Sequence, residues 1–198
     1  ARVVHAARRD ARVQLVSRAE PARGSSVQLT LAQAVLKGER MDDVVRDAVM
    51  LGVAAIQPLV TKRAEATVAQ LVRGARVDRW QRVALASAKQ CHRAVLPDIR
   101  TPLTLENWLA EPLPATRLMF VEPGAADDVE PLARLRAERV PADAVLLVGP
   151  EGGWDAAEIA QARAAGVRLV SLGGRTLRAD AVPIAALSIL EFLWDQSC

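Results

Sequence analysis

The sequence predicts an α/β fold built on a mostly parallel sheet. Short apolar segments of strand length alternate with longer segments whose apolar residues recur at helical spacing, which is the pattern of successive βα units. The run at residues 144–148 is apolar at every position, as expected for a strand covered on both faces. A second unit of the same form begins with a strand at residues 167–172.

The remaining elements follow from the same periodicities. Helix 41–51 carries its valines on one face, and Gly52 follows it as a residue suited to the left-handed turn after a helix. Thr104 is placed to cap a short helix that contains Trp108. Further strands are predicted at residues 12–16, 27–31, 54–60 and 117–121, and further helices at residues 77–91 and around residues 132–139.

A glycine-rich loop at residues 149–153, with the sequence Gly-Pro-Glu-Gly-Gly, joins the apolar strand to a helix. Glycine and proline signal a tight turn here, and glycine lets a ligand approach the backbone closely. Asp155 and Glu158 are spaced as a capping box, and Trp154 and Ile159 as the hydrophobic staple around it. The segment therefore predicts a strand, a loop and a helix N-terminus in immediate succession.

A second loop, at residues 173–178, repeats this arrangement before a helix that Asp180 is placed to cap and that extends to Trp194. Open α/β sheets bind ligands outside the carboxyl ends of their strands, where both loops are expected to lie. The two loops therefore predict a ligand site at one edge of the sheet. Two ordinary βα connections without a ligand are the alternative, since glycine turns alone specify no ligand.

The composition is that of a folded globular chain, with 51% hydrophobic residues among 198. No apolar run approaches the length of a membrane span and no charged-then-apolar leader opens the sequence, so no membrane association is expected. Cys91 and Cys198 are far apart, which argues against a disulfide framework and for a reducing cytoplasm. With His5 and His92 as the only histidines, neither a zinc site nor a Ser–His–Asp triad is expected. The phosphate-binding motifs of P-loop and Rossmann proteins are also missing.

Positive charge is concentrated in the first half of the chain. Residues 1–100 contain 18 Lys or Arg and 9 Asp or Glu, a net +9, whereas residues 101–198 contain 8 and 14, a net −6. Arginine supplies 23 of the 26 basic residues, and its guanidinium suits phosphate groups and stacking on bases. A compositional bias explains the Arg-to-Lys ratio equally well, but the asymmetry between the halves predicts an anionic partner for the first half.

Several ordered motifs resemble those of one enzyme family. The first is Gly-Pro-Glu-Gly-Gly-Trp at residues 149–154, and the second is Ser-Leu-Gly-Gly-Arg-Thr-Leu-Arg at residues 171–178. Upstream, Leu-Ala-Gln-Ala at residues 31–34 and Lys-Gly-Glu-Arg-Met-Asp at residues 37–42 complete the set. Over residues 27–198 the chain resembles the RsmE family of SPOUT methyltransferases, which methylate the N3 nitrogen of a uridine in 16S rRNA.

This resemblance implies a SPOUT domain at residues 27–198, whose last helix threads through a loop to form a deep C-terminal trefoil knot. Residues 1–26, a basic segment with a linker at residues 21–26, resemble the end of the family's PUA-like RNA-binding β-barrel, so that most of this barrel is expected to be missing. A homodimer is implied as well, because SPOUT enzymes pair their last helices and residues 181–194 here are apolar on most faces.

The resemblance further implies that S-adenosylmethionine is the cofactor and that 16S rRNA of the small ribosomal subunit is the substrate, in the cytoplasm and without a metal. Two alternatives stay open: a SPOUT methyltransferase that acts on a ribose 2′-hydroxyl, and a non-catalytic RNA-binding or ribosome-assembly protein on the same scaffold. The intact glycine loops disfavour the second alternative. Leu172 and Leu177 would sandwich the adenine, with core packing as the alternative. The implied cofactor contacts are Phe120, Glu122, Pro123, Val148, Gly149, Pro150, Glu151, Gly152, Gly153, Leu172, Gly173, Arg175 and Leu177.

Methylation at N3 requires that the uridine lose a proton, so a cation near the uracil oxygens would stabilise the developing anion. Arg178 and Arg175 follow the second loop and are the candidates for this catalytic role. Glu151 would accept the proton or orient the base, and a carboxylate stabilised by the dipole of the following helix is the alternative.

RNA is expected to lie over basic side chains of the first half of the chain. Arg93 matches an arginine of the family after the long helix, with a solvated surface arginine as the alternative. The chain departs from the family at Ala179-Asp180-Ala181, where the family has Thr-Glu-Thr, so the acid is kept but shortened. The expected RNA contacts are Arg9, Arg12, Lys37, Arg40, Lys62, Arg63 and Arg93.

Overall fold

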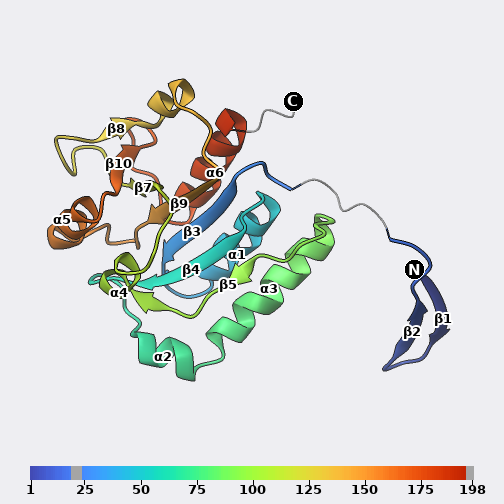
Figure 1. Cartoon of the computed structure of the whole chain (residues 1–198). Helices are drawn as coiled ribbons and strands as arrows, with labels where there is room; N and C mark the ends of the chain where they lie inside the picture. Colours follow the sequence, from blue (N-terminus) through green and yellow to red (C-terminus); the bar gives the residue numbers. More distant parts are fainter. Residues whose placement is uncertain (19–23, 195–198) are drawn as a thin grey trace.

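An eight-stranded sheet forms the centre of the protein, and every pair of neighbouring strands in it runs parallel (Figure 1). The structure is a computed structural model that describes residues 1–18 and 24–194. The strands of the sheet are β3 (Gln28–Ala34), β4 (Ala55–Val60), β5 (Asp98–Ile99), β6 (Leu103–Thr104), β7 (Thr116–Phe120), β8 (Glu130–Pro131), β9 (Asp143–Val148) and β10 (Arg168–Ser171).

Strand β9 lies in the middle of the sheet, whose order is β5-β4-β3-β9-β7-β10-β8, with β6 also paired to β4. Leu146 of β9 is in register with Leu31 of β3 and with Leu118 of β7. Side chains of β9 alternate between the two faces, so that Leu146 belongs to one apolar cluster and Leu147 to the other. Burial on both faces explains why residues 144–148 are apolar at every position, as predicted.

Helices cover both faces of this sheet (Figure 1). The helical segments are α1 (Arg40–Met50), α2 (Val68–Arg73), α3 (Arg76–Gln90), α4 (Leu105–Leu109), η1 (Leu132–Ala137), α5 (Ala156–Ala164) and α6 (Ala181–Trp194). Buried side chains of α1, α3, η1 and α6 join the larger apolar cluster on one face, and those of α4 and α5 join the cluster on the other face. The result is a three-layer α/β structure, the fold class that the sequence predicts.

The predicted helix boundaries are confirmed at three capping positions. Gly52, which follows α1, has a φ of +92°, a value that favours glycine. The Thr104 side chain accepts a hydrogen bond from the backbone at the start of α4. Asp155 and Glu158 form the complete capping box of α5.

The predicted helix around residues 132–139 is wrong in type and length. The segment is a 3-10 helix, η1, whose buried Leu132 and Leu135 are spaced three residues apart, which matches three residues per turn. Helix α2 and strands β5, β6 and β8 were not predicted, because a six-residue helix and two-residue strands are too short to show a periodicity.

Residues 2–14 form a separate antiparallel hairpin of β1 (Arg2–Ala6) and β2 (Ala11–Gln14). Every residue of both strands is exposed, since a two-stranded ribbon buries little without a covering layer. The strand predicted at residues 12–16 is therefore correct in type, but it begins one residue earlier and ends at Gln14. Of the predicted linker, residues 21–23 lie outside the described residues, as does Cys198.

An ion-pair cluster holds the edge of the sheet at β8 and β10. Arg168 of β10 donates hydrogen bonds to both carboxylate oxygens of Glu130 at 3.3 and 2.8 Å, and to both of Glu138 at 2.8 Å. These hydrogen bonds lower the pKa of both glutamates below the usual value, so both stay ionised. The cluster ties β8 and the end of η1 to the last strand.

Within the described ranges, no helix is long and apolar enough to cross a membrane. In the same part of the chain, no group of three His, Cys, Asp or Glu side chains is placed to hold a metal ion. Cys91, at the end of α3, is a free thiol.

Candidate functional site

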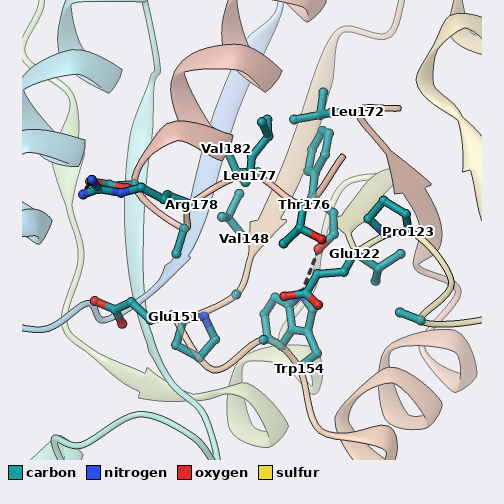
Figure 2. A pocket seen from close by; sticks show the side chains of 18 of the residues that line it. Glu122, Pro123, Val148, Glu151, Trp154, Leu172, Thr176, Leu177, Arg178 and Val182 are labelled. Carbon is teal, nitrogen blue, oxygen red and sulfur yellow. Dashed lines mark hydrogen bonds and ion pairs between the residues drawn. The ribbon is translucent and has the colours of Figure 1, made fainter. Parts of the chain in front are cut away.

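A cavity of about 580 Å³ opens at the carboxyl ends of β7, β9 and β10 (Figure 2). Its walls come from three loops, at residues 121–125, 149–154 and 172–180. Because the three strands run parallel, their carboxyl ends meet at one edge of the sheet, which brings together loops that are far apart in sequence. The cavity therefore lies where the two glycine loops predict a ligand site.

Apolar side chains and backbone form most of the cavity lining. Leu172, Leu177 and Val182 lie at one end and Trp154 at the other, and Glu122 adds a carboxylate from the first loop (Figure 2). Leu177 is 39% exposed, so core packing does not account for its position. A cavity with an apolar lining and a few polar groups is typical of small-molecule sites.

Trp154 connects the first two loops of the site. Its indole nitrogen donates a hydrogen bond to the backbone carbonyl of Phe120 at 2.9 Å, and its ring is buried. A Cβ atom on Gly149 would stand only 3.1 Å from the indole ring, so the ring packs directly on the glycine backbone. Glycine at position 149 is therefore required by the tryptophan as well as by the cavity.

The loop after β4 is fixed to the start of α5 by the buried carboxylate of Glu158. This carboxylate accepts hydrogen bonds from the backbone amides of Lys62 at 2.7 Å and of Asp155 at 2.9 Å. The Lys62 ammonium lies 2.9 Å from Asp155, and this hydrogen bond holds the pKa of Asp155 below its usual value. Arg63 donates to the Gly152 carbonyl at 2.7 Å. The loop thus forms a fourth wall beside the glycine loop.

Glu151 is held by the segment that leads into α1. Its carboxylate accepts hydrogen bonds from the backbone amide of Lys37 at 3.0 Å and from the Arg40 guanidinium at 3.1 Å. The N-cap of α5 is Asp155, four residues later, so the proposed alternative of a carboxylate at the N-terminus of that helix applies to Asp155. The Glu151 carboxylate therefore already accepts two hydrogen bonds, and because it lines the cavity it is suited to orient a molecule bound there.

Arg178 lies at the mouth of the cavity with its side chain 72% exposed. It pairs with Asp180 through hydrogen bonds of 3.1 and 2.6 Å. Partial burial raises the pKa of Asp180, but hydrogen bonds from Arg178 and the backbone, together with the charges of Arg178 and Arg40, leave the pKa below its usual value. Asp180, predicted to cap α6, directly precedes this helix, and its carboxylate binds Arg178, while Pro183 in the first turn has no backbone N–H to donate.

Twelve of the thirteen predicted cofactor contacts line the cavity. The exception is Gly152, whose missing side chain would face Arg63 at 3.3 Å from Cβ to Cβ. Gly152 therefore makes room for the arginine beside the loop. The lining residues are Phe120, Glu122, Pro123, Val148, Gly149, Pro150, Glu151, Gly153, Leu172, Gly173, Arg175 and Leu177.

Several lining residues were not predicted as site residues. The sequence assigns Trp154 and Ile159 only to a hydrophobic staple and Val182 only to an apolar helix, yet all three line the cavity. A glycine loop after a strand permits close approach of a ligand, whereas an apolar residue beside or within the next helix is expected in any packed helix. Arg40 and Arg63, predicted to contact RNA, also line this cavity. The other lining residues are Val121, Ala125, Thr176, Arg178, Ala179 and Asp180.

The predicted RNA contacts fall into three places. Lys37, Arg40, Lys62 and Arg63 lie around the cavity, on the loops after β3 and β4 and at the start of α1. Arg9 and Arg12 lie on the hairpin, in its turn and in β2.

Arg93 lies at the opposite edge of the sheet, near the amino end of β4. Its guanidinium donates to the backbone carbonyls of Val49 and Val53, each at 2.9 Å, and so holds the end of α1. Burial lowers the pKa of Arg93. This structural role differs from both interpretations of Arg93 drawn from the sequence, an RNA contact and a solvated arginine.

Comparison with known proteins agrees with this geometry. Residues 23–191 match the model of the RNA methyltransferase domain family. The ribosomal RNA small subunit methyltransferase E of Mesomycoplasma hyopneumoniae is 30% identical over 81% of this chain and 68% of its own length. The chain belongs to the RsmE family. The relative from Synechocystis is 35% identical over 83% of this chain, which spans about half (53%) of that protein's length.

A solved structure of this family has the same architecture. The ribosomal RNA small subunit methyltransferase E from Neisseria gonorrhoeae, bound to S-adenosyl methionine, superposes with a TM-score of 0.76. The two chains are 31% identical, and the match covers 89% of this chain and 70% of the other. This relative therefore shares the overall α/β fold with the protein.

Replacement of Glu158 by alanine should loosen the loop after β4. The backbone amide of Lys62 would lose its acceptor, and a hydrogen bond to a charged group contributes about 1.5–3 kcal/mol, which corresponds to roughly tenfold or more in local opening. Amide hydrogen exchange at Lys62 should therefore accelerate by that factor. Glu106→Ala, at an exposed acid in the first turn of α4, is the control and should leave this exchange unchanged. Equal exchange in both variants would contradict the proposed attachment.

Proposed function

We propose that the protein transfers a methyl group from S-adenosylmethionine to the N3 nitrogen of a uridine in 16S rRNA of the small ribosomal subunit. The observation that carries this proposal is the cavity at the carboxyl ends of β7, β9 and β10, which is built from the two glycine loops in a member of the RsmE family. Basic residues around the cavity and in the first half of the chain supply an RNA-binding surface.

The residues present fit S-adenosylmethionine. Leu172, Leu177 and Val182 offer an apolar slot for adenine, and the carboxylate of Glu122 is an acceptor for ribose hydroxyls. Gly153 and Gly173 line the cavity with their backbone, since they have no side chain, and their φ values of +69° and +116° favour glycine. When bound, this cofactor supplies a methyl group already activated by its sulfonium, and the protein contributes position and charge.

Arg178 is the residue that we assign to the uracil. Its guanidinium is exposed at the mouth of the cavity and would stabilise negative charge on the uracil oxygens as the N3 proton leaves. Arg175 on the same loop supplies a second guanidinium. Glu151, already hydrogen-bonded to Lys37 and Arg40, is suited to orient the base more than to take its proton.

We further propose the architecture and assembly of SPOUT enzymes: a trefoil knot in the SPOUT domain at residues 27–198, a PUA-like barrel of which residues 1–26 are the end, and a cytoplasmic homodimer. Support for the dimer comes from α6, on which Ile184, Ile189 and Phe192 are exposed, Phe192 by 83%. A helix with large apolar side chains on its outer face is typical of an interface.

Substitution of Gly173 should abolish cofactor binding. At its φ of +116° a valine is strained, and the strain would distort the loop that lines the cavity. Calorimetry with S-adenosylmethionine should show a loss of affinity on the order of 100-fold or more, equivalent to about 2.7 kcal/mol. Gly174→Val is the matched control, because its Cβ would meet open space and its φ lies outside the left-handed range. If Gly173→Val bound S-adenosylmethionine with the affinity of the wild type, the cofactor site could not lie at this loop.

Replacement of Arg178 by alanine should slow methyl transfer at saturating RNA. The expected loss in the single-turnover rate is on the order of 100-fold, as for a removed oxyanion donor, with RNA affinity nearly kept. Digestion of the methylated small-subunit RNA to nucleosides should yield 3-methyluridine, and a 2′-O-methylated nucleoside would reject the N3 assignment. A variant that lost only RNA affinity would show that Arg178 binds substrate without a catalytic role.

A substitution on the outer face of α6 tests the proposed dimer. Light scattering at micromolar protein should give twice the mass of one chain for the wild type, and Phe192→Asp should give the mass of a single chain, because an aspartate cannot be buried there without a partner. Leu85→Asp, at an exposed leucine of α3, serves as the control and should remain dimeric. A monomeric wild type would refute the proposal.

A further inference from the structure

A second cavity, of about 430 Å³, adjoins the first and shares two residues with it, Arg63 and Glu151. Its other walls are the loops at residues 35–38 and 63–66, together with residues of α2 and the beginning of α3. The roles assigned above to cofactor binding and catalysis leave this cavity unused. Its volume is within the range of cavities that bind small molecules or single nucleotides.

The floor of the second cavity is apolar and its rim is charged. Buried side chains form the floor, and three cations stand around the rim together with the amide of Gln70 and the carboxylate of Glu65. An apolar surface suits the face of a base, cations suit a phosphate, and amide and carboxylate groups suit the polar edges of a base or a ribose. The floor residues are Val35, Leu36 and Leu71, and the cations are Lys37, Arg63 and Arg76.

The three cations differ in how far their charge is already engaged. Lys37 lies 2.6 Å from Glu65, and that hydrogen bond raises its pKa. Arg63 donates to the Gly152 carbonyl. Arg76 forms no ion pair within 4.0 Å with any residue in 1–18 or 24–194, so its charge is available to a ligand from outside the chain.

We propose that the second cavity binds a nucleotide of the RNA next to the uridine that is methylated, with its phosphate against Arg76 and its base over the apolar floor. This inference rests on the proposed function and extends it. Glu151 and Arg63 form the boundary between the two cavities, so a nucleotide in the second places its neighbour at the mouth of the first. Single-stranded RNA suits this arrangement, because only unpaired nucleotides can be spread over two cavities.

The test compares charge reversal at two arginines of one helix. Arg76→Glu should weaken binding of a short fluorescein-labelled single-stranded oligouridylate on the order of tenfold and reduce the slope of log affinity against log salt by about one. Arg82→Glu, at an exposed arginine of α3 outside both cavities, should change the affinity by no more than about twofold. Arg76→Lys, which keeps the charge, should restore most of the affinity.

A second measurement separates this inference from the proposed function. Methylation of small-subunit RNA by Arg76→Glu should show a raised KM for RNA, with S-adenosylmethionine affinity in calorimetry equal to that of the wild type. Equal losses of RNA affinity in Arg76→Glu and Arg82→Glu would reveal general electrostatic attraction and overturn the inference. If the wild type binds S-adenosylmethionine but methylates no RNA, the proposed function fails, while the oligouridylate comparison still decides the role of the cavity.

Discussion

The parallel pairing of β9 with β3 on one side and β7 on the other determines where every loop of the site lies. These pairs are in register through their central leucines, and all three strands therefore end at the same edge of the sheet. The loops that follow them carry the cavity walls, and the loop after β4 joins them because β4 pairs in parallel with β3. Apolar side chains on both faces of β9 supply the burial that holds this register.

Hydrogen bonds between the loops then fix the positions of these loops at the carboxyl ends of the strands. Trp154 joins the loop after β9 to the end of β7, and Glu158 joins the loop after β4 to the start of α5. Each bond ends on a backbone group and so fixes the path of the chain independently of any ligand. The guanidinium of Arg178, by contrast, is largely exposed, and within the described residues its hydrogen bonds go to the neighbouring carboxylate of Asp180.

The sequence predicts the fold class, the central strands and the two glycine loops, because continuous apolar runs and capping residues are local signals. It also predicts most of the cavity lining, through the motifs of a family. Contacts between residues that are far apart in the sequence leave no such local signal, so they could not be predicted. The loop at Gly152 faces Arg63 instead of the cavity, and Arg93 binds the end of a helix more than 40 positions earlier in the chain. The second cavity was not predicted either, since its walls converge only when β3 and β4 pair.

The two-residue strand β8 has a consequence for how the molecule behaves in a crowded solution. An outermost strand presents unpaired backbone groups to which another chain can add. Here that strand is short, its second residue, Pro131, has no N–H to donate, and the charges of Glu130, Glu138 and Arg168 stand beside it. A chain approaching this edge would have to desolvate a cluster of ionised groups for few hydrogen bonds. This edge of the sheet therefore resists the addition of another strand.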